Sequence, residues 1–200
     1  MQKSQISIDA RTGDGFTMDN LPRPETEMPY LWVGFLLAFL GCMAEIYVGL
    51  SDPLVGLPGW QPPSWLFFSS MIPGFYWLYC VKRFHDAIWT VPGYNHPITP
   101  SRAVAFHFLP LFNLYWTFKW PLEVAKFVNW RTQSPAMKGW IAGLLVLLAF
   151  LARQVFGSLG LFLLFASGVY VARHMRRAFA AAEVPESALQ PPETRGPLGI

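Results

Sequence analysis

Long apolar runs, separated by short polar or proline-containing stretches, dominate the pattern of this 200-residue chain. Four of the runs suit membrane helices, because a bilayer core of about 30 Å needs roughly 20 residues at 1.5 Å each. The pattern therefore predicts an all-α, polytopic membrane protein. We expect the four transmembrane helices at about 30–50, 65–81, 137–153 and 156–173.

A fifth apolar stretch, residues 103–118, has Pro110 in its middle, and the basic residues decide whether it crosses the membrane. Cytoplasmic loops are enriched in Lys and Arg. If the stretch crosses, the 15 Lys and Arg residues divide seven to eight between the two faces; if it does not, 14 share one face and only Arg153 lies on the other. We therefore predict four spans, both termini cytoplasmic, and a proline-broken re-entrant or interfacial helix within 100–131. Its second half, 119–131, has the spacing of an amphipathic helix in the headgroup region.

The domain organisation follows from these spans: a polar N-terminal tail at 1–29, a membrane domain at 30–178 and a polar C-terminal tail at 179–200. Composition agrees, since 53% of the residues are hydrophobic and 14% are charged. The net charge is only +3, with no long Lys or Arg run. The expected surroundings are therefore a lipid bilayer, and nucleic acid is excluded as a partner.

Glu45 is the only acidic residue inside a predicted span. Gly34, Ala38 and Gly41 precede it at helical spacing, so the acid shares a face with small residues, the kind of face that packs against other helices. The side chain should therefore point inward. Three roles are open to it: a structural pair with Arg153 at the turn of the last hairpin, a protonated or water-facing acid, or a proton or cation relay.

Two further pairs of small residues fall in the last two spans. Gly139 and Gly143 form a GxxxG pair at the start of the third span, and Gly168 and Ala172 are four residues apart in the fourth. This spacing lets helix backbones approach closely. We expect both pairs to pack within the final hairpin, with contact to a partner subunit as the alternative.

The sequence shows little catalytic or metal-binding chemistry. The histidines His85, His96, His107 and His174 all fall on the cytoplasmic side of the four-span topology, with no HxxxH or HxxE pairing. A metal or haem site would need ligands converging from two segments. We therefore expect interfacial hydrogen bonding and ordinary surface titration from the histidines, and no cofactor. There is also no G-x-S-x-G, Walker-type loop or HExxH, so the chain does not look like an enzyme.

The stretch ITPSRAVAFHFLPLFNLYWTF, residues 98–118, resembles a family of uncharacterised bacterial multi-span membrane proteins. Those proteins share a Thr-Pro start, an Ala-Val-x-Phe step and a Pro-x-Phe-Asn-x-Tyr-Trp core. His107 departs from the apolar residue expected at its position. The resemblance covers residues 75–131, and it implies a multi-pass protein of the bacterial inner membrane with this element as its core feature, but no activity. The matching residues are Thr99, Pro100, Ala103, Val104, Phe106, Pro110, Phe112, Asn113, Tyr115 and Trp116.

Aromatic-rich apolar faces, strips of small residues and scarce polarity within the spans favour a non-enzymatic accessory subunit. Such a subunit would pack against a larger membrane complex, for example a respiratory or photosynthetic one. One alternative is a small channel or transporter that uses Glu45 and a helix kink at Pro73–Gly74. A second is a lipid-binding or interfacial protein that works through His107 and Asn113.

Overall fold

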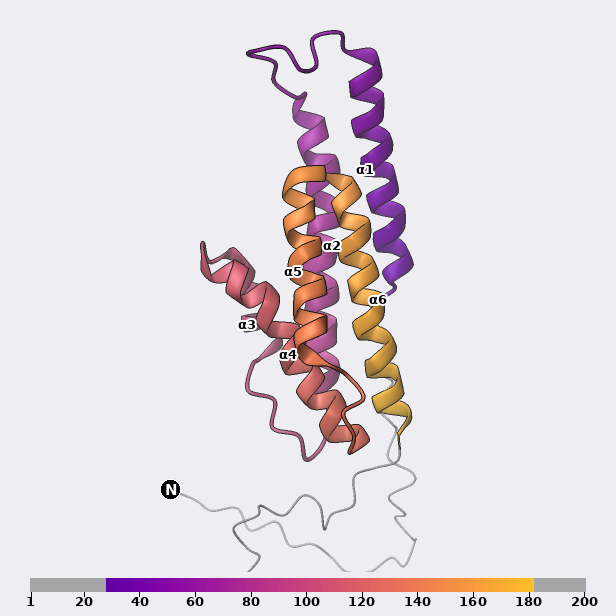
Figure 1. Ribbon diagram of the computed structural model, residues 1–200, viewed down its shortest axis with the longest axis vertical. Coiled ribbons are helices and arrows are strands. Elements are labelled where there is room, and N and C mark those ends of the chain that lie inside the picture. Colours follow the sequence, from indigo (N-terminus) through magenta and orange to yellow (C-terminus); the bar gives the residue numbers. More distant parts are fainter. Residues whose placement is uncertain (1–27, 182–200) are drawn as a thin grey trace, which may run out of the picture.

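The computed structural model describes residues 28–181, and every regular element in that range is a helix, which confirms the predicted all-α class there. The predicted tails at 1–29 and 179–200 lie almost entirely outside the described residues. Figure 1 shows the arrangement. The elements are α1 (Leu31–Ser51), α2 (Ser64–Trp89), α3 (Pro100–Ala105), the 3₁₀ turn η2 (Phe106–Phe108), α4 (Phe112–Thr132), α5 (Gly139–Phe156) and α6 (Ser158–Ala180).

Three of the helices, α1, α5 and α6, are long and apolar enough to span a membrane. They coincide with three of the four predicted spans. The fourth prediction, 65–81, falls within α2, which continues to Trp89 through the charged residues Lys82, Arg83 and Asp86. The helix also runs through Pro73, although a proline there removes one backbone hydrogen bond.

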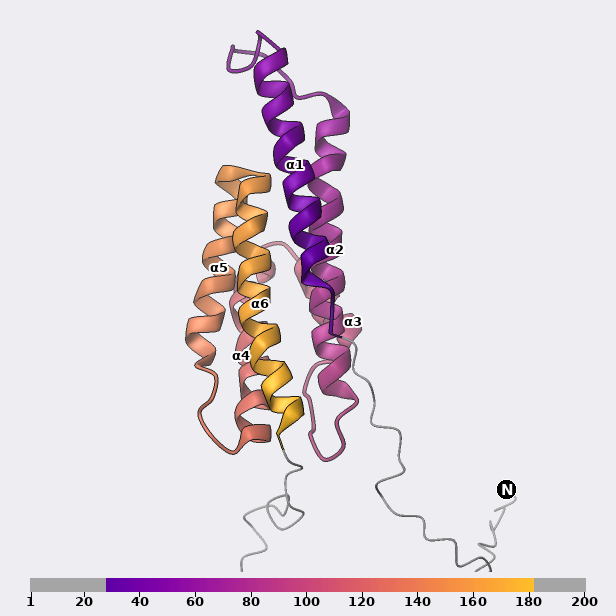
Figure 2. The same cartoon turned by 90° about the vertical axis from the view of Figure 1, so that its right-hand side faces the viewer.

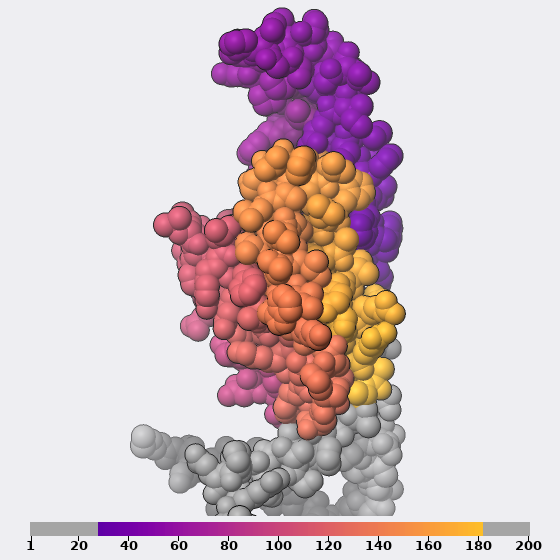
Figure 3. All heavy atoms as spheres, in the orientation of Figure 1, coloured from indigo at the N-terminus to yellow at the C-terminus, as the bar shows by residue number. Residues whose placement is uncertain are grey.

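The helices form two hairpins, α1–α2 and α5–α6, joined along their length by contacts of α1 and α2 with α6. Figures 1 and 2 show that the α1–α2 hairpin extends well beyond the α5–α6 turn. In the space-filling view, its end rises clear of the shorter hairpin (Figure 3). We call this part the overhang; it comprises residues 46–51 of α1, the loop 52–63, and residues 64–68 of α2.

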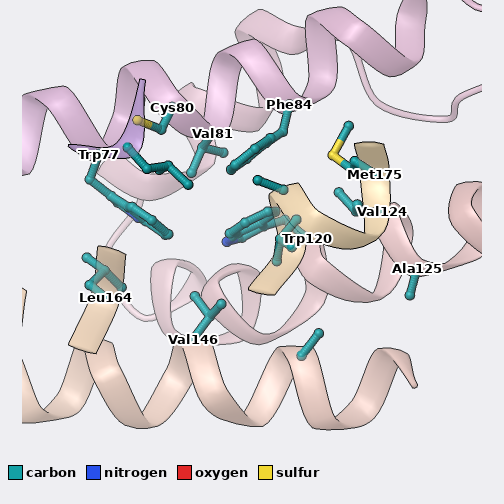
Figure 4. Close-up of a cluster of buried hydrophobic side chains, with 14 of the residues drawn as sticks. Trp77, Cys80, Val81, Phe84, Trp120, Val124, Ala125, Val146, Leu164 and Met175 are labelled. Atoms are coloured by element: carbon teal, nitrogen blue, oxygen red, sulfur yellow. The ribbon is translucent and has the colours of Figure 1, made fainter. Parts of the chain in front are cut away.

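Helix α4 belongs to the core of the other half of the molecule. Trp120 is fully buried, 6.0 Å from Trp77 in an edge-on contact and 6.1 Å from Phe84 in a stacked one, both between ring centroids. Figure 4 shows these three side chains converging with Val146 of α5 and others from α6. Residues 119–131 are helical as predicted, and the aromatic residues of α4 turn the apolar face of this helix into the bundle. Its position in the headgroup region stays a prediction.

The predicted break at Pro110 lies at the tip of a projection formed by α3 and the start of α4 (Figure 1). Thr99 caps α3 by accepting a hydrogen bond from the Arg102 amide, and Pro100 occupies the first helical position. After η2 the chain leaves the helix, and Leu111 adopts a φ of 62° with 93% of its surface exposed. An exposed leucine in this strained conformation gives the projection an apolar tip.

The small residues pack within the chain. Gly34 lies against Phe165, Gly41 against Ser158, and Gly168 against Trp77; Ala38 and Ala172 are also buried. Side chains at Gly139 and Gly143 would collide instead with α4, the latter at 2.6 Å from the Phe118 carbonyl oxygen. The expectation that the two pairs pack the final hairpin is therefore wrong for Gly139 and Gly143, which let α5 approach α4, and for Gly168, which faces Trp77 of α2.

Asn129 fixes the α4–α5 connection through two hydrogen bonds. Its side-chain amide donates to the Met137 carbonyl at 3.0 Å, and its oxygen accepts from the Met137 amide at 2.8 Å. Asn129→Ala is expected to lower the free energy of unfolding by about 2 kcal/mol, since each bond contributes about 1 kcal/mol. Thermal unfolding of the detergent-purified chain measures this. The control is Gln133→Ala, which removes a single exposed hydrogen bond, from the Gln133 side chain to the Trp130 carbonyl, just past the end of α4. A loss no larger than that of the control would contradict the role of Asn129.

Candidate functional site

Glu45 points inward as predicted, and it binds the start of α6. Its carboxyl oxygen Oε1 accepts hydrogen bonds from the Ser158 amide at 3.0 Å and from the Ser158 hydroxyl at 2.8 Å. The first amides of a helix have no partner within the helix, and a side-chain oxygen commonly satisfies them. Gly157, with a φ of 54°, leaves room for this approach, because a side chain there would lie 2.7 Å from Oε1. The acid therefore ties α1 to the α5–α6 turn.

Arg153 does not form the predicted pair with Glu45. Within the described residues, its guanidinium makes neither an ion pair nor a hydrogen bond, and it extends towards α2, where a side chain at Gly74 would meet it at 3.0 Å. The sequence could not reveal this, because Glu45 is bound by a backbone amide and a hydroxyl, both of Ser158, and not by a charged side chain. The consequence is a half-buried cation close to the turn that has no ion-pair partner among residues 28–181.

The second polar site is a cluster of buried histidines that the sequence analysis missed. His85 Nδ1 of α2 lies 2.7 Å from His96 Nε2 in the loop between α2 and α3. His85 has no exposed surface and His96 has 3%. The expectation that these two titrate as ordinary surface residues is therefore wrong. The loop folds back against α2, so two segments converge, and spacing in the sequence gives no sign of this.

His107, of η2, belongs to the same neighbourhood. Its Nδ1 donates to the Ala103 carbonyl at 2.9 Å, and Trp116 Nε1 donates to the same oxygen at 2.7 Å. The His85 ring stacks on Trp116 with centroids 6.1 Å apart. His107 thus satisfies a backbone carbonyl of α3, in the segment that precedes Pro110. Asn113 instead accepts a hydrogen bond from the Thr117 hydroxyl, and Tyr115 is exposed.

Among residues 28–181, four buried polar atoms of this cluster have no hydrogen-bond partner: His85 Nε2, His96 Nδ1, His107 Nε2 and Trp120 Nε1. Buried polar groups in native proteins are normally paired, so a concentration of exceptions marks a site rather than ordinary core. Burial, followed by the nearby His96 and His107, lowers the pKa of His85 to about 3. Burial also lowers the pKa of His107 to about 4. It lowers the pKa of His96 as well, although the negative charge of Glu123 partly offsets this effect. All three rings are neutral at pH 7.

A charged group borders the cluster on α4. Glu123 is 3% exposed and pairs with Lys126 at 3.0 Å and with Lys119 at 3.2 Å. Burial acts to raise the pKa of this carboxyl, but the hydrogen bonds and charges of the two lysines outweigh it and hold the pKa below its usual value. The arrangement places one negative charge between two positive ones.

The cluster's chemistry is that of neutral imidazoles close together in a dry environment. In the described part of the chain, no group of three or more His, Cys, Asp or Glu side chains is arranged to hold a metal ion. What the His85–His96 contact provides is a hydrogen bond between two groups that can each bind a proton.

Comparison of the chain with protein-family models, with curated proteins and with solved structures finds no match. The resemblance of residues 98–118 to a family of bacterial membrane proteins therefore stays a prediction. Function has to be argued from the two polar sites and from the surface of the helices.

Proposed function

We propose that this chain is a non-enzymatic accessory subunit of the bacterial inner membrane that packs against a larger membrane complex. In this proposal α1, α2, α5 and α6 form four spans, and both termini face the cytoplasm. The charge asymmetry supports the topology, since 14 of the 15 Lys and Arg residues then share one face. The segment α3–η2–α4 enters and leaves on the cytoplasmic side, with its apolar tip at Leu111 in the lipid.

The observation that carries the proposal is the difference in length between the two hairpins. The uncharged part of α5, from Gly139 to Ala152, is about 21 Å long, against a core of about 30 Å. From Glu45 to the end of α1 at Ser51, a further rise of about 9 Å extends past the α5–α6 turn. The overhang thus stands without cover from the rest of the described chain, residues 28–181. Its large exposed apolar side chains are Ile46, Tyr47, Leu50, Leu54, Val55, Leu57, Trp65, Phe67 and Phe68.

Arg153 indicates the chemistry of the partner that would cover the overhang. The residue lies in the last turn of α5, below the level of the overhang, and so at membrane depth when the overhang reaches the outer surface. A cation at that depth is costly unless an opposite charge or water reaches it. A transmembrane partner that covers the overhang and places a carboxylate at Arg153 would supply both the apolar contact and the missing charge.

Arg153→Gln is expected to detach the chain from its partner. Truncating one member of a buried charge pair at an interface costs about 2–5 kcal/mol, which corresponds to a loss of affinity of about thirtyfold or more. The measurement is mild-detergent extraction from native membranes, followed by size separation and mass spectrometry of the proteins that travel with the chain. The wild-type chain should co-migrate with a reproducible complex, and the variant should migrate alone.

The control is Arg102→Gln, which removes a positive charge from an exposed position on α3 and should leave the complex intact. A wild-type chain that migrates alone, near 22.6 kDa plus detergent, would refute the subunit proposal. If the complex survives Arg153→Gln unchanged, the chain is still a subunit, but the proposed contact at Arg153 is refuted.

The hydrogen bonds between Glu45 and Ser158 weigh against the alternative of a channel or transporter. Both donors lie at the start of α6, so the acid has a structural task that needs no passing ion. Flux of an ion or solute that is abolished by Glu45→Gln in a correctly folded chain would favour transport instead.

A further inference from the structure

The contact between His85 and His96 fixes how many protons the pair holds. The two nitrogens are 2.7 Å apart, so one must carry the hydrogen and the other must accept it. Whichever ring donates, one of the outer nitrogens carries a hydrogen and the other has a lone pair. Both outer nitrogens, His85 Nε2 and His96 Nδ1, are buried without a partner. The neutral pair therefore keeps one unoccupied proton-accepting position in the core.

Adding protons affects the pair in two stages. A first proton on the free lone pair leaves the hydrogen bond in place but creates a buried positive charge, which is costly without an opposite charge. A second proton turns both facing nitrogens into donors and sets two positive rings against each other. The contact must then break, and the part of the chain that can move away is the loop 90–99 that carries His96.

We propose that the His85–His96 pair is a buried proton-binding site whose occupation in acid releases the loop 90–99 from α2. The site is independent of the overhang and Arg153, so it goes beyond the subunit role. The ligand of this site is the proton, which binds the pair when the loop is open and is excluded when the loop is closed. Release would change the shape of the end of the molecule that carries most of the basic residues.

The charged and titratable groups around the pair offset only part of the cost of protonating it. His107 from η2 is a third neutral imidazole, and Tyr94 packs on His96 with ring centroids 6.0 Å apart. Glu123 of α4 is the nearest negative charge, but its two lysines leave that group with a net positive charge. Two further charged residues, Arg83 and Asp86, flank His85 along α2.

The pH window follows from linkage. Each ring has a lower pKa in the closed state than the ordinary value of about 6.5 that it regains on opening. The closed state is therefore favoured above about pH 6.5 and loses stability as the pH falls below it, because the open state binds protons that the closed state excludes. With two protons taken up, the opening constant should rise about a hundredfold for each pH unit below the ordinary value.

The test is hydrogen–deuterium exchange of the full chain in lipid nanodiscs between pH 7.5 and 5, corrected for the intrinsic pH dependence of exchange. The Val91 amide donates to the Ile88 carbonyl at the end of α2, and the Tyr94 amide donates to the Val91 carbonyl within the loop, so both report its opening. His96→Gln places an amide where Nε2 lies, so it keeps a hydrogen bond to His85 but cannot titrate. This variant should reduce the slope to about tenfold per pH unit. His85→Asn, which substitutes for Nδ1, should do the same.

His174→Gln is the matched control. This residue is half-buried on α6 and bonds the Tyr170 carbonyl, away from the pair, so the variant should keep the wild-type slope. Loop amides in the wild-type chain whose corrected exchange does not change with pH would overturn the proposal. A wild-type slope in His96→Gln and His85→Asn would overturn it as well, because the protons would then bind elsewhere.

Discussion

Gly160→Ala should prevent the α5–α6 hairpin from closing. A Cβ atom at this position of α6 would lie 2.3 Å from the Cα of Arg153 and 2.4 Å from its amide nitrogen. Both are backbone atoms, so no rotation of a side chain relieves the collision and the two helices must move apart. Overpacking costs about 1–3 kcal/mol where side chains can adjust, and a backbone collision should reach or exceed the upper end. Separation would also pull Ser158 away from Glu45.

The expected result is a fall of about 10 °C or more in the apparent melting temperature, since 1 kcal/mol shifts a chain of this size by about 2–4 °C. Gly49→Ala is the matched control, because a Cβ at this position of α1 meets nothing within 4 Å. Alanine forms helices better than glycine by about 1 kcal/mol, so this variant should melt at the same temperature or higher. Equal melting temperatures for the two variants would mean that the helices are not as close as described.

The sequence predicted those parts of the fold that depend on local patterns. Apolar runs indicate α1, α5 and α6, and the Thr99–Pro100 pair gives the start of α3. Pro110 gives the break in the segment that follows. These features could be predicted because each depends on residues adjacent in the sequence or one helical turn apart.

The polar sites depended on contacts between distant segments, and there the sequence was a poor guide. His85 and His96 meet because an eleven-residue separation includes a loop that folds back, which no helical or strand period encodes. Arg153 was the natural partner for Glu45 by charge, but the start of α6 offered an amide and a hydroxyl at the same place. Backbone donors carry no residue type, so a search for complementary side chains overlooks them.

Glu45→Ala is expected to destabilise the chain by about 3 kcal/mol, because it leaves the buried Ser158 amide and hydroxyl without an acceptor. Glu45→Gln keeps one acceptor oxygen in the same position, so its loss should be smaller, about 1 kcal/mol. Unfolding of the purified chain measures both.

A double-mutant cycle with Ser158→Ala separates the cap from other roles of the acid. If the two side chains act together, the double variant loses less than the sum of the single losses, with a coupling of at least about 0.5 kcal/mol. Part of the bond survives Ser158→Ala, because the backbone amide still reaches Oε1, so the coupling reports the hydroxyl bond alone. Additive losses would show that Glu45 does not act through the Ser158 hydroxyl.

Since Gln cannot release a proton, a relay would lose its flux in Glu45→Gln while the fold kept most of its stability. The structural role therefore predicts that stability decreases from the wild type through Gln to Ala, and that the complex formed by the wild-type chain survives in Glu45→Gln.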